Sequence, residues 1–216
     1  GASLVQALNA AGKPAAGAVY RSPLQVAFSP DGRLLAASDP TAAAAVLFDV
    51  ASGKAIGEVP LQGEPADIAF SADGKLTYVA ECTAGTVAEI DGDGEVTRRL
   101  KVSPWPVGLA IAARRGRLLV TDAATDAVLI VELSGGRQLA RVPVGHWPGQ
   151  IAITPDERIA VVANRLPAGN PADPTVAASV TLIDLETGNN VVVSGDGTYT
   201  FRMNGDSHRF RWIQNR

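Results

Sequence analysis

Four polar residues recur at regular intervals along the sequence and could do chemistry together. They are Asp39, Glu81, Asp122 and Asn164, separated by steps of 42, 41 and 42 residues. Carboxylate and amide oxygens can hold a cation or a basic partner if they meet on one face of the folded chain. The alternative is that each residue caps a turn by accepting hydrogen bonds from nearby backbone N–H groups. Because the position repeats so regularly, the turn-capping alternative is favoured.

Two tryptophans and a histidine form the second candidate site. Trp105 and Trp147 each stand just before a proline, in SPWPVG and VGHWPG, and His146 precedes Trp147. Equivalent segments of neighbouring repeats would place the two indoles side by side, as an aromatic platform for a ligand or partner. The alternative is that the rings pack between repeats. The other copies have Ser22 and Glu64 at this position, so the platform would be local.

The sequence contains few groups that could carry out catalysis. It has two histidines, His146 and His208, and one cysteine, Cys82, which excludes an internal disulfide and any C-x-x-C metal or haem pair. Neither a nucleophile elbow nor a phosphate-binding loop is present. We therefore expect no catalytic residue, no metal site and no cofactor, and predict that the chain is not an enzyme.

Composition excludes further classes of partner. The 216 residues are 46% hydrophobic and carry a formal net charge of -3, which is typical of a globular chain. This mild acidity gives no reason to expect a nucleic acid or an anionic membrane surface as partner. No apolar run is long enough to span a bilayer, and the N-terminal segment lacks the pattern of a signal peptide.

The elements that would position these residues follow from an internal repeat. Its prolines, Pro23, Pro65, Pro106 and Pro148, keep the same steps of 42, 41 and 42 residues. Each copy reads as short Val-, Ile-, Leu- and Ala-rich strands, separated by turns such as SPDG and ASG. Four short strands in about 40 residues are the signature of a propeller blade. The sequence therefore predicts an all-β fold, a β-propeller of about four four-stranded blades, at about 23–64, 65–105, 106–147 and 148–188.

The strand sequences LTYVAE, LLVTD and IAVVAN resemble the Y-V-T-N strand of bacterial YVTN-type β-propeller repeats. The resemblance covers about residues 22–188 and includes the segment PVGHWPGQIAITPDERIAVVANR and the strand SVTLIDLETG. It implies a scaffold or binding module located in the periplasm, at the cell surface or secreted. The insertion 166–178 is similar to one in surface members associated with c-type cytochromes, so the resemblance also implies a c-type cytochrome as a protein partner. The C-x-x-C-H motif that haem attachment requires is absent, so no haem chemistry carries over to this chain.

Both ends depart from the repeat pattern. Residues 1–21 form an N-terminal extension in which 13–20 align with an outer strand and would be an orphan strand. Residues 189–216 form a divergent tail that reads as a β-hairpin around NGDS. Rings of this family usually hold more than four blades, so we expect an open arc or a fragment of a larger ring, the alternative being a small closed ring.

The leading hypothesis is a non-enzymatic scaffold or binding module that uses its loop face for a protein or small ligand. The first alternative is a fragment of a redox-associated surface protein or propeller enzyme whose catalytic or cytochrome part is missing. The second alternative is a structural surface repeat without a ligand. Because copies that agree build the scaffold, the residues where copies disagree are the better candidates for function.

Overall fold

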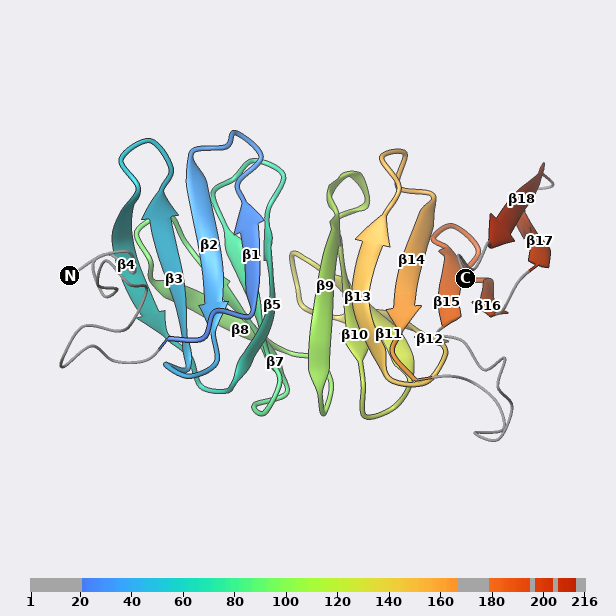
Figure 1. Cartoon of the computed structure of the whole chain (residues 1–216), viewed down its shortest axis with the longest axis horizontal. Helices are drawn as coiled ribbons and strands as arrows, with labels where there is room; N and C mark the ends of the chain where they lie inside the picture. The colour runs from blue at the N-terminus through green and yellow to red at the C-terminus, as the bar shows by residue number, and fades with distance from the viewer. Residues whose placement is uncertain (1–20, 167–178, 195–196, 204–205, 213–216) are drawn as a thin grey trace, which may run out of the picture. The chain divides into compact units, whose positions relative to one another are not determined.

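The computed structural model describes residues 21–166 and 179–194, together with the backbone of the strands at 197–203 and 206–212. These residues form four four-stranded antiparallel sheets and one two-stranded hairpin (Figure 1). Each sheet is a meander in chain order, as predicted, and we call the sheets blades 1 to 4. The chain divides into two compact units, Gly1–Arg99 with blades 1 and 2 and Leu100–Arg216 with blades 3 and 4, and the boundary falls within the last strand of blade 2.

The strands have the following bounds. Blade 1 contains β1 (Gln25–Phe28), β2 (Leu34–Asp39), β3 (Ala44–Asp49) and β4 (Lys54–Pro60). Blade 2 contains β5 (Pro65–Phe70), β6 (Thr77–Glu81), β7 (Thr86–Ile90) and β8 (Val96–Lys101). Blade 3 contains β9 (Pro106–Ala112), β10 (Arg117–Asp122), β11 (Ala127–Glu132) and β12 (Gln138–Pro143). Blade 4 contains β13 (Pro148–Ile153), β14 (Ile159–Asn164), β15 (Ser179–Asp184) and β16 (Asn190–Ser194).

The turn between the first two strands of a blade is fixed by its own side chains. In blade 1 the Ser29 hydroxyl donates to Asp31 at 2.6 Å and accepts from the Leu34 N–H at 2.9 Å. Gly32 adopts a φ of 69°, a left-handed conformation that glycine tolerates without steric cost. Blades 2 and 4 repeat the hydroxyl–carboxylate pair, whereas blade 3 has a short 3₁₀ turn, Ala113–Arg115, at this place.

The core of the first unit lies between blades 1 and 2. Because strand side chains alternate between the two faces of a sheet, each blade has two faces. In this core, blade 2 contributes one of its faces, which we call the leading face. Blade 1 contributes the opposite face, which we call the trailing face. The leading face carries large side chains, and the trailing face carries mostly small ones. The leading face consists of Ile68, Phe70, Val79 and Ile90, and the trailing face of Ala27, Ala36, Ala45 and Leu47.

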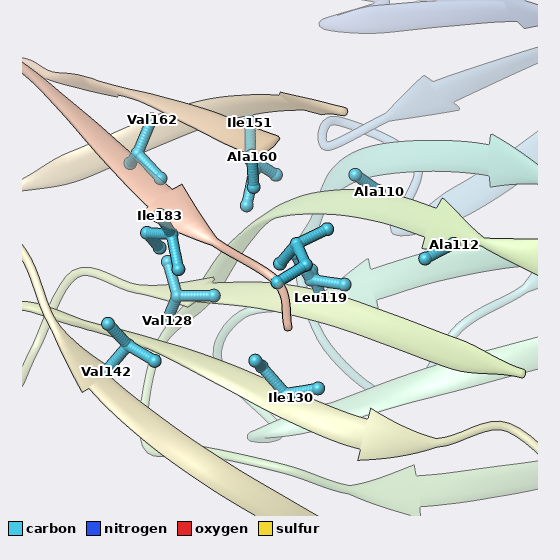
Figure 2. Packing of buried hydrophobic residues seen from close by; sticks show 11 residues of the cluster. Ala110, Ala112, Leu119, Val128, Ile130, Val142, Ile151, Ala160, Val162 and Ile183 are labelled. Carbon is cyan, nitrogen blue, oxygen red and sulfur yellow. The ribbon is translucent and has the colours of Figure 1, made fainter. Parts of the chain in front are cut away.

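The core of the second unit likewise lies between its two blades, 3 and 4, but here the trailing face of the earlier blade also carries large side chains. Figure 2 shows Ile151, Val162 and Ile183 of blade 4 gathered with Leu119 and Val128 of blade 3. Leu119, Val128, Val162 and Ile183 are fully buried, and they come from β10, β11, β14 and β15. Within each unit, therefore, the later blade packs its leading face on the trailing face of the earlier blade.

The segment set apart as a divergent tail begins with a blade strand. β16 pairs with β15 from Ser179↔Ser194 to Ile183↔Asn190, so blade 4 extends to Ser194 rather than ending at residue 188. Beyond it, the predicted hairpin is present as β17 (Gly197–Met203) paired with β18 (Asp206–Trp212). The expected orphan strand at 13–20 and the insertion after Leu166 lie outside the described residues. None of the described residues belongs to a helix long and apolar enough to cross a membrane.

Candidate binding face

The four recurring polar residues occupy the last position of the second strand in each blade, as the repeat predicts. They end β2, β6, β10 and β14, and all four are at most 2% exposed: Asp39, Glu81, Asp122 and Asn164. Burial of a carboxylate is unfavourable unless hydrogen bonds compensate for the lost hydration. The partners of each residue therefore indicate what the position does.

The two aspartates bind the backbone of their own blades. Asp122 accepts hydrogen bonds from the N–H of Trp105 at 3.2 Å and of Ala124 at 3.1 Å, and from the Thr125 hydroxyl at 2.5 Å. Asp39 accepts from Ser22 N–H, the equivalent of Trp105, at 3.4 Å and from Ala42 N–H at 3.2 Å. Each carboxylate thus fixes both the segment that leads into the first strand and the turn after the second strand.

Glu81 and Asn164 are also bound within their blades, by different partners. Glu81 accepts from Gln62 N–H at 2.7 Å and from the Arg99 guanidinium at 3.1 Å. The Asn164 side-chain amide donates to Ser179 and Thr181 at 3.0 Å each, while its oxygen is buried without a hydrogen-bond partner. The backbone N–H groups bound by Asp39, Glu81 and Asp122 agree with the capping alternative, whereas Asn164 binds only side chains of its own blade. A ligand role for the four residues stays a prediction.

The two predicted platform tryptophans are both partly open to solvent. Trp105 is 40% exposed and Trp147 is 46% exposed, and each immediately precedes the first strand of its blade. These first strands, β9 and β13, lie next to each other in the second unit (Figure 1). Their backbones approach closely where Gly108 meets the carbonyl of Gly149. The two tryptophans therefore lie at the same ends of two neighbouring strands, on one side of the unit.

The backbone on both sides of each indole is fixed by hydrogen bonds. The carbonyl of Trp105 accepts from Ala123 N–H at 3.1 Å, and that of Trp147 accepts from Arg165 N–H at 3.0 Å. The N–H of Trp105 donates to Asp122 in its own blade, but the N–H of Trp147 donates to Asp126 of the neighbouring blade, at 2.8 Å. The tryptophans occupy equivalent positions, yet only Trp147 is bound across the blade junction.

Asp126 is a site residue that the repeat pattern did not reveal. Its other oxygen lies 2.7 Å from Nδ1 of His146, whose side chain is 64% exposed. Asp126 stands in the turn between β10 and β11, where the equivalent residues are Ala43 and Gly85. All three adopt a positive φ. An acidic residue among small ones was the signal that could have identified it from the sequence.

Trp147 itself has a strained backbone. Its φ of 53° lies in the left-handed region, which is unfavourable for a bulky side chain. The bond from its N–H to Asp126 and the bond from Arg165 to its carbonyl retain this conformation. Strain of this kind costs about 1–3 kcal/mol and clusters at functional sites. The exposed pair of Asp126 and His146 is worth only about 0–1 kcal/mol by itself.

Two further titratable groups in the described part of the chain have raised pKa values. Burial, together with the charge of Glu64, raises the pKa of the Cys82 thiol, so the unreactive protonated form is favoured. Burial raises the pKa of Tyr78 to about 12, and Glu89 contributes to this shift. Within the part of the chain that the structure describes, no three His, Cys, Asp or Glu side chains are grouped so that they could hold a metal ion.

Comparison with known proteins establishes the architecture. No protein-family model matches the chain. No curated protein matches its sequence. Among solved structures, hydrazine synthase of Kuenenia stuttgartiensis is similar, with a TM-score of 0.70 and 22% sequence identity over 82% of this chain. The match covers 52% of the hydrazine synthase chain, so this chain spans about half its length. At this identity the similarity concerns the fold, and the chain is a β-propeller module built of four-stranded blades.

Proposed function

We propose that this chain is a non-enzymatic binding module of the YVTN propeller type, and that its binding surface is the platform of Trp105, His146 and Trp147. The observation that carries the proposal is the backbone of Trp147. A bulky residue at a φ of 53° is bound by Asp126 from the neighbouring blade while its indole stays 46% exposed. If the strained backbone served only to pack the indole into the core, we would expect the ring to be buried.

The chemistry of the platform suits recognition. Half-exposed indoles bury a large apolar area on binding at little entropic cost, and tryptophan is enriched among the residues that dominate binding energies. The Asp126–His146 pair beside Trp147 adds a carboxylate and an imidazole that can donate or accept hydrogen bonds. Because the backbone is fixed on both sides of each ring, a ligand meets a preorganised surface.

A screen for ligands with matched variants tests the proposal. The wild-type protein and the Trp105→Ala and Trp147→Ala variants are applied to a random-peptide display library and to an oligosaccharide array. We expect ligands that bind wild type to bind each variant at least about tenfold more weakly, since each lost indole is worth about 1.4 kcal/mol or more. Leu139→Ala is the control, because Leu139 is 37% exposed on the outer strand β12.

Two results would refute the platform. The first is that wild type captures no member of either collection above the level of a variant that carries both Trp105→Ala and Trp147→Ala. The second is that ligands are captured but bind the folded Trp105→Ala and Trp147→Ala variants as tightly as they bind Leu139→Ala. Circular dichroism of each variant shows whether the β-structure is intact before binding is compared.

On the family resemblance we further propose an extracytoplasmic location and a c-type cytochrome as one protein partner. Both follow from the YVTN-like strands and from the insertion 166–178. The gene context tests them: an adjacent reading frame that encodes C-x-x-C-H would support the cytochrome partner. It would also favour the alternative that this chain is part of a redox-associated surface protein.

A further inference from the structure

Arg165 is a cationic residue beside the tryptophan platform that the repeat pattern does not contain. It directly follows Asn164, and the residues at its position in the other blades are uncharged: Pro40, Cys82 and Ala123. The backbone N–H of Arg165 donates to the carbonyl of Trp147 at 3.0 Å, which extends the pairing of β13 with β14 by one step. Arg165 and Trp147 are therefore neighbours at the same end of blade 4.

The side chain of Arg165 lies across the backbone of Gly149, two residues after Trp147. A Cβ at Gly149 would lie 2.5 Å from Nε of Arg165, which is an overlap. The other blades have residues with a Cβ at this position: Leu24, Ala66 and Val107. Blade 4 thus departs from the repeat at two positions that meet, and the glycine leaves the space that the Arg165 side chain occupies.

The guanidinium of Arg165 carries a charge that the described residues do not neutralise. Arg165 is exposed, and its side chain makes no hydrogen bond or ion pair within the described part of the chain. The carboxylate of Asp126 is already bound through both oxygens, to the His146 ring and to the Trp147 N–H. A guanidinium is a planar fork of N–H donors that fits a carboxylate through two parallel hydrogen bonds. Arg165 therefore suits a carboxylate that the ligand supplies.

The spacing of indole and guanidinium suits two side chains of one peptide. Trp147 and Gly149, which Arg165 covers, are two residues apart, and two residues of chain span at most about 7 Å. In an extended peptide, side chains two positions apart lie on the same face at a spacing of roughly 6.5 Å. The backbone N–H and carbonyl groups of Trp105 and Trp147 already have partners, so such a peptide is recognised through its side chains.

We propose that the platform binds an acidic peptide segment of a partner protein, in which an apolar residue and an Asp or Glu residue stand two positions apart. The apolar side chain contacts the indole of Trp147, and the carboxylate accepts hydrogen bonds from the guanidinium of Arg165. This inference rests on the proposed function, because it names the ligand of that same platform.

A random-peptide display library selected on the wild-type protein tests the pattern. We expect the enriched peptides to carry Asp or Glu two positions from an aromatic or aliphatic residue. An enriched peptide is then synthesised with its acidic residue and with the matching Asn or Gln, and fluorescence anisotropy measures the binding of both.

Arg165→Gln should bind the acidic peptide about tenfold more weakly than wild type does, and the amide peptide equally well, because only the carboxylate uses the guanidinium. Arg137→Gln is the matched control and should bind both peptides as wild type does. Arg137 is an arginine with a 70% exposed side chain, and it stands beside Glu132 in the turn between β11 and β12, whereas Asp126 precedes the start of β11.

Gly149→Ala tests the position of the guanidinium without removing its charge. The added methyl group displaces the Arg165 side chain, which is the only group that a Cβ there would meet among the nearest described atoms. This variant should therefore lose affinity for the acidic peptide and keep its affinity for the amide peptide. Circular dichroism establishes that Arg165→Gln and Gly149→Ala are folded before binding is compared.

The possible failures of this inference and of the proposed function are distinguishable. Enriched peptides that bind Trp147→Ala weakly but lack an acidic residue, or that bind Arg165→Gln as tightly as Arg137→Gln, overturn the acidic ligand and leave the platform standing. Capture of sugars from the oligosaccharide array without any enriched peptide overturns the peptide ligand alone. Peptides that bind Trp147→Ala as tightly as wild type, or no capture from either collection, overturn the platform and this inference together.

Discussion

Because β9 and β13 approach closely at Gly108, adding one methyl group there should strongly destabilise the fold. A Cβ placed there would overlap the backbone carbonyl oxygen of Gly149 and lie 2.7 Å from Oγ1 of Thr121. The same carbonyl accepts a 2.7 Å hydrogen bond from the Thr121 hydroxyl, which is fully buried. Because the overlapping atom belongs to the backbone, Gly108→Ala has to move the strand β13 away from β9.

The size of the effect follows from two terms. Forcing a methyl group into a packed site typically costs about 1–3 kcal/mol. Displacing the Gly149 carbonyl from Thr121 adds about 1 kcal/mol, the net value of a typical hydrogen bond. We therefore expect Gly108→Ala to lower the free energy of unfolding of the second unit by about 2–4 kcal/mol.

Urea denaturation followed by tryptophan fluorescence measures this loss, because Trp105, Trp147 and Trp212 all belong to the second unit. The control is Gly57→Ala in β4, where a Cβ meets nothing within 4 Å. Alanine there should leave β4 in place and hardly alter the unfolding midpoint, which is followed by circular dichroism because β4 lies in the first unit. If the free energy of unfolding of Gly108→Ala lies within about 0.5 kcal/mol of wild type at an unchanged slope, β9 and β13 do not approach as described.

Two other predictions concern titratable groups. The hydroxyl of Ser71 holds the pKa of Asp73 below its ordinary value of 3.8, and Thr154 does the same for Asp156. A depressed carboxyl pKa stabilises the fold above the unfolded value and ceases to do so as the pH falls through the folded value. Asp73→Asn should therefore be less stable than wild type in urea at neutral pH, and the difference should shrink as the pH falls below the ordinary value of 3.8; a constant difference would contradict this. Because burial raises the pKa of Cys82, iodoacetamide at mildly alkaline pH should alkylate the native protein far more slowly than the urea-unfolded protein, as measured by mass spectrometry. Equal rates would show that the thiol is accessible.

Much of the fold could be predicted because the repeat can be recognised at several independent positions. The spacing of Asp39, Glu81, Asp122 and Asn164 predicts that each ends the second strand of its blade, and the strand bounds agree. The SPDG turn was predictable because its chemistry is local: Ser29, Asp31 and Gly32 need only one another and the adjacent backbone. The boundary of blade 4 was misplaced, since NNVVVS lacks the alanine-rich composition of the other copies yet pairs with β15.

Only part of the candidate site could be identified from the sequence. The tryptophans stood out because Ser22 and Glu64 replace them in the other copies. Asp126 did not, because its contacts to His146 and Trp147 join residues about half a repeat apart in two different blades. A pattern that compares equivalent positions does not detect a bond between non-equivalent ones.

The sequence by itself determined the period, the strands and the turns of this protein, because these depend on short-range chemistry that each copy repeats. Only the tertiary structure decided which acidic residue holds Trp147, which tryptophan backbone is strained and which sheet face stays open. Those properties depend on what lies opposite a residue in the neighbouring blade. In a propeller the face of a blade is buried or exposed according to its neighbour, so the same apolar pattern is core at Phe70 and surface at Phe28.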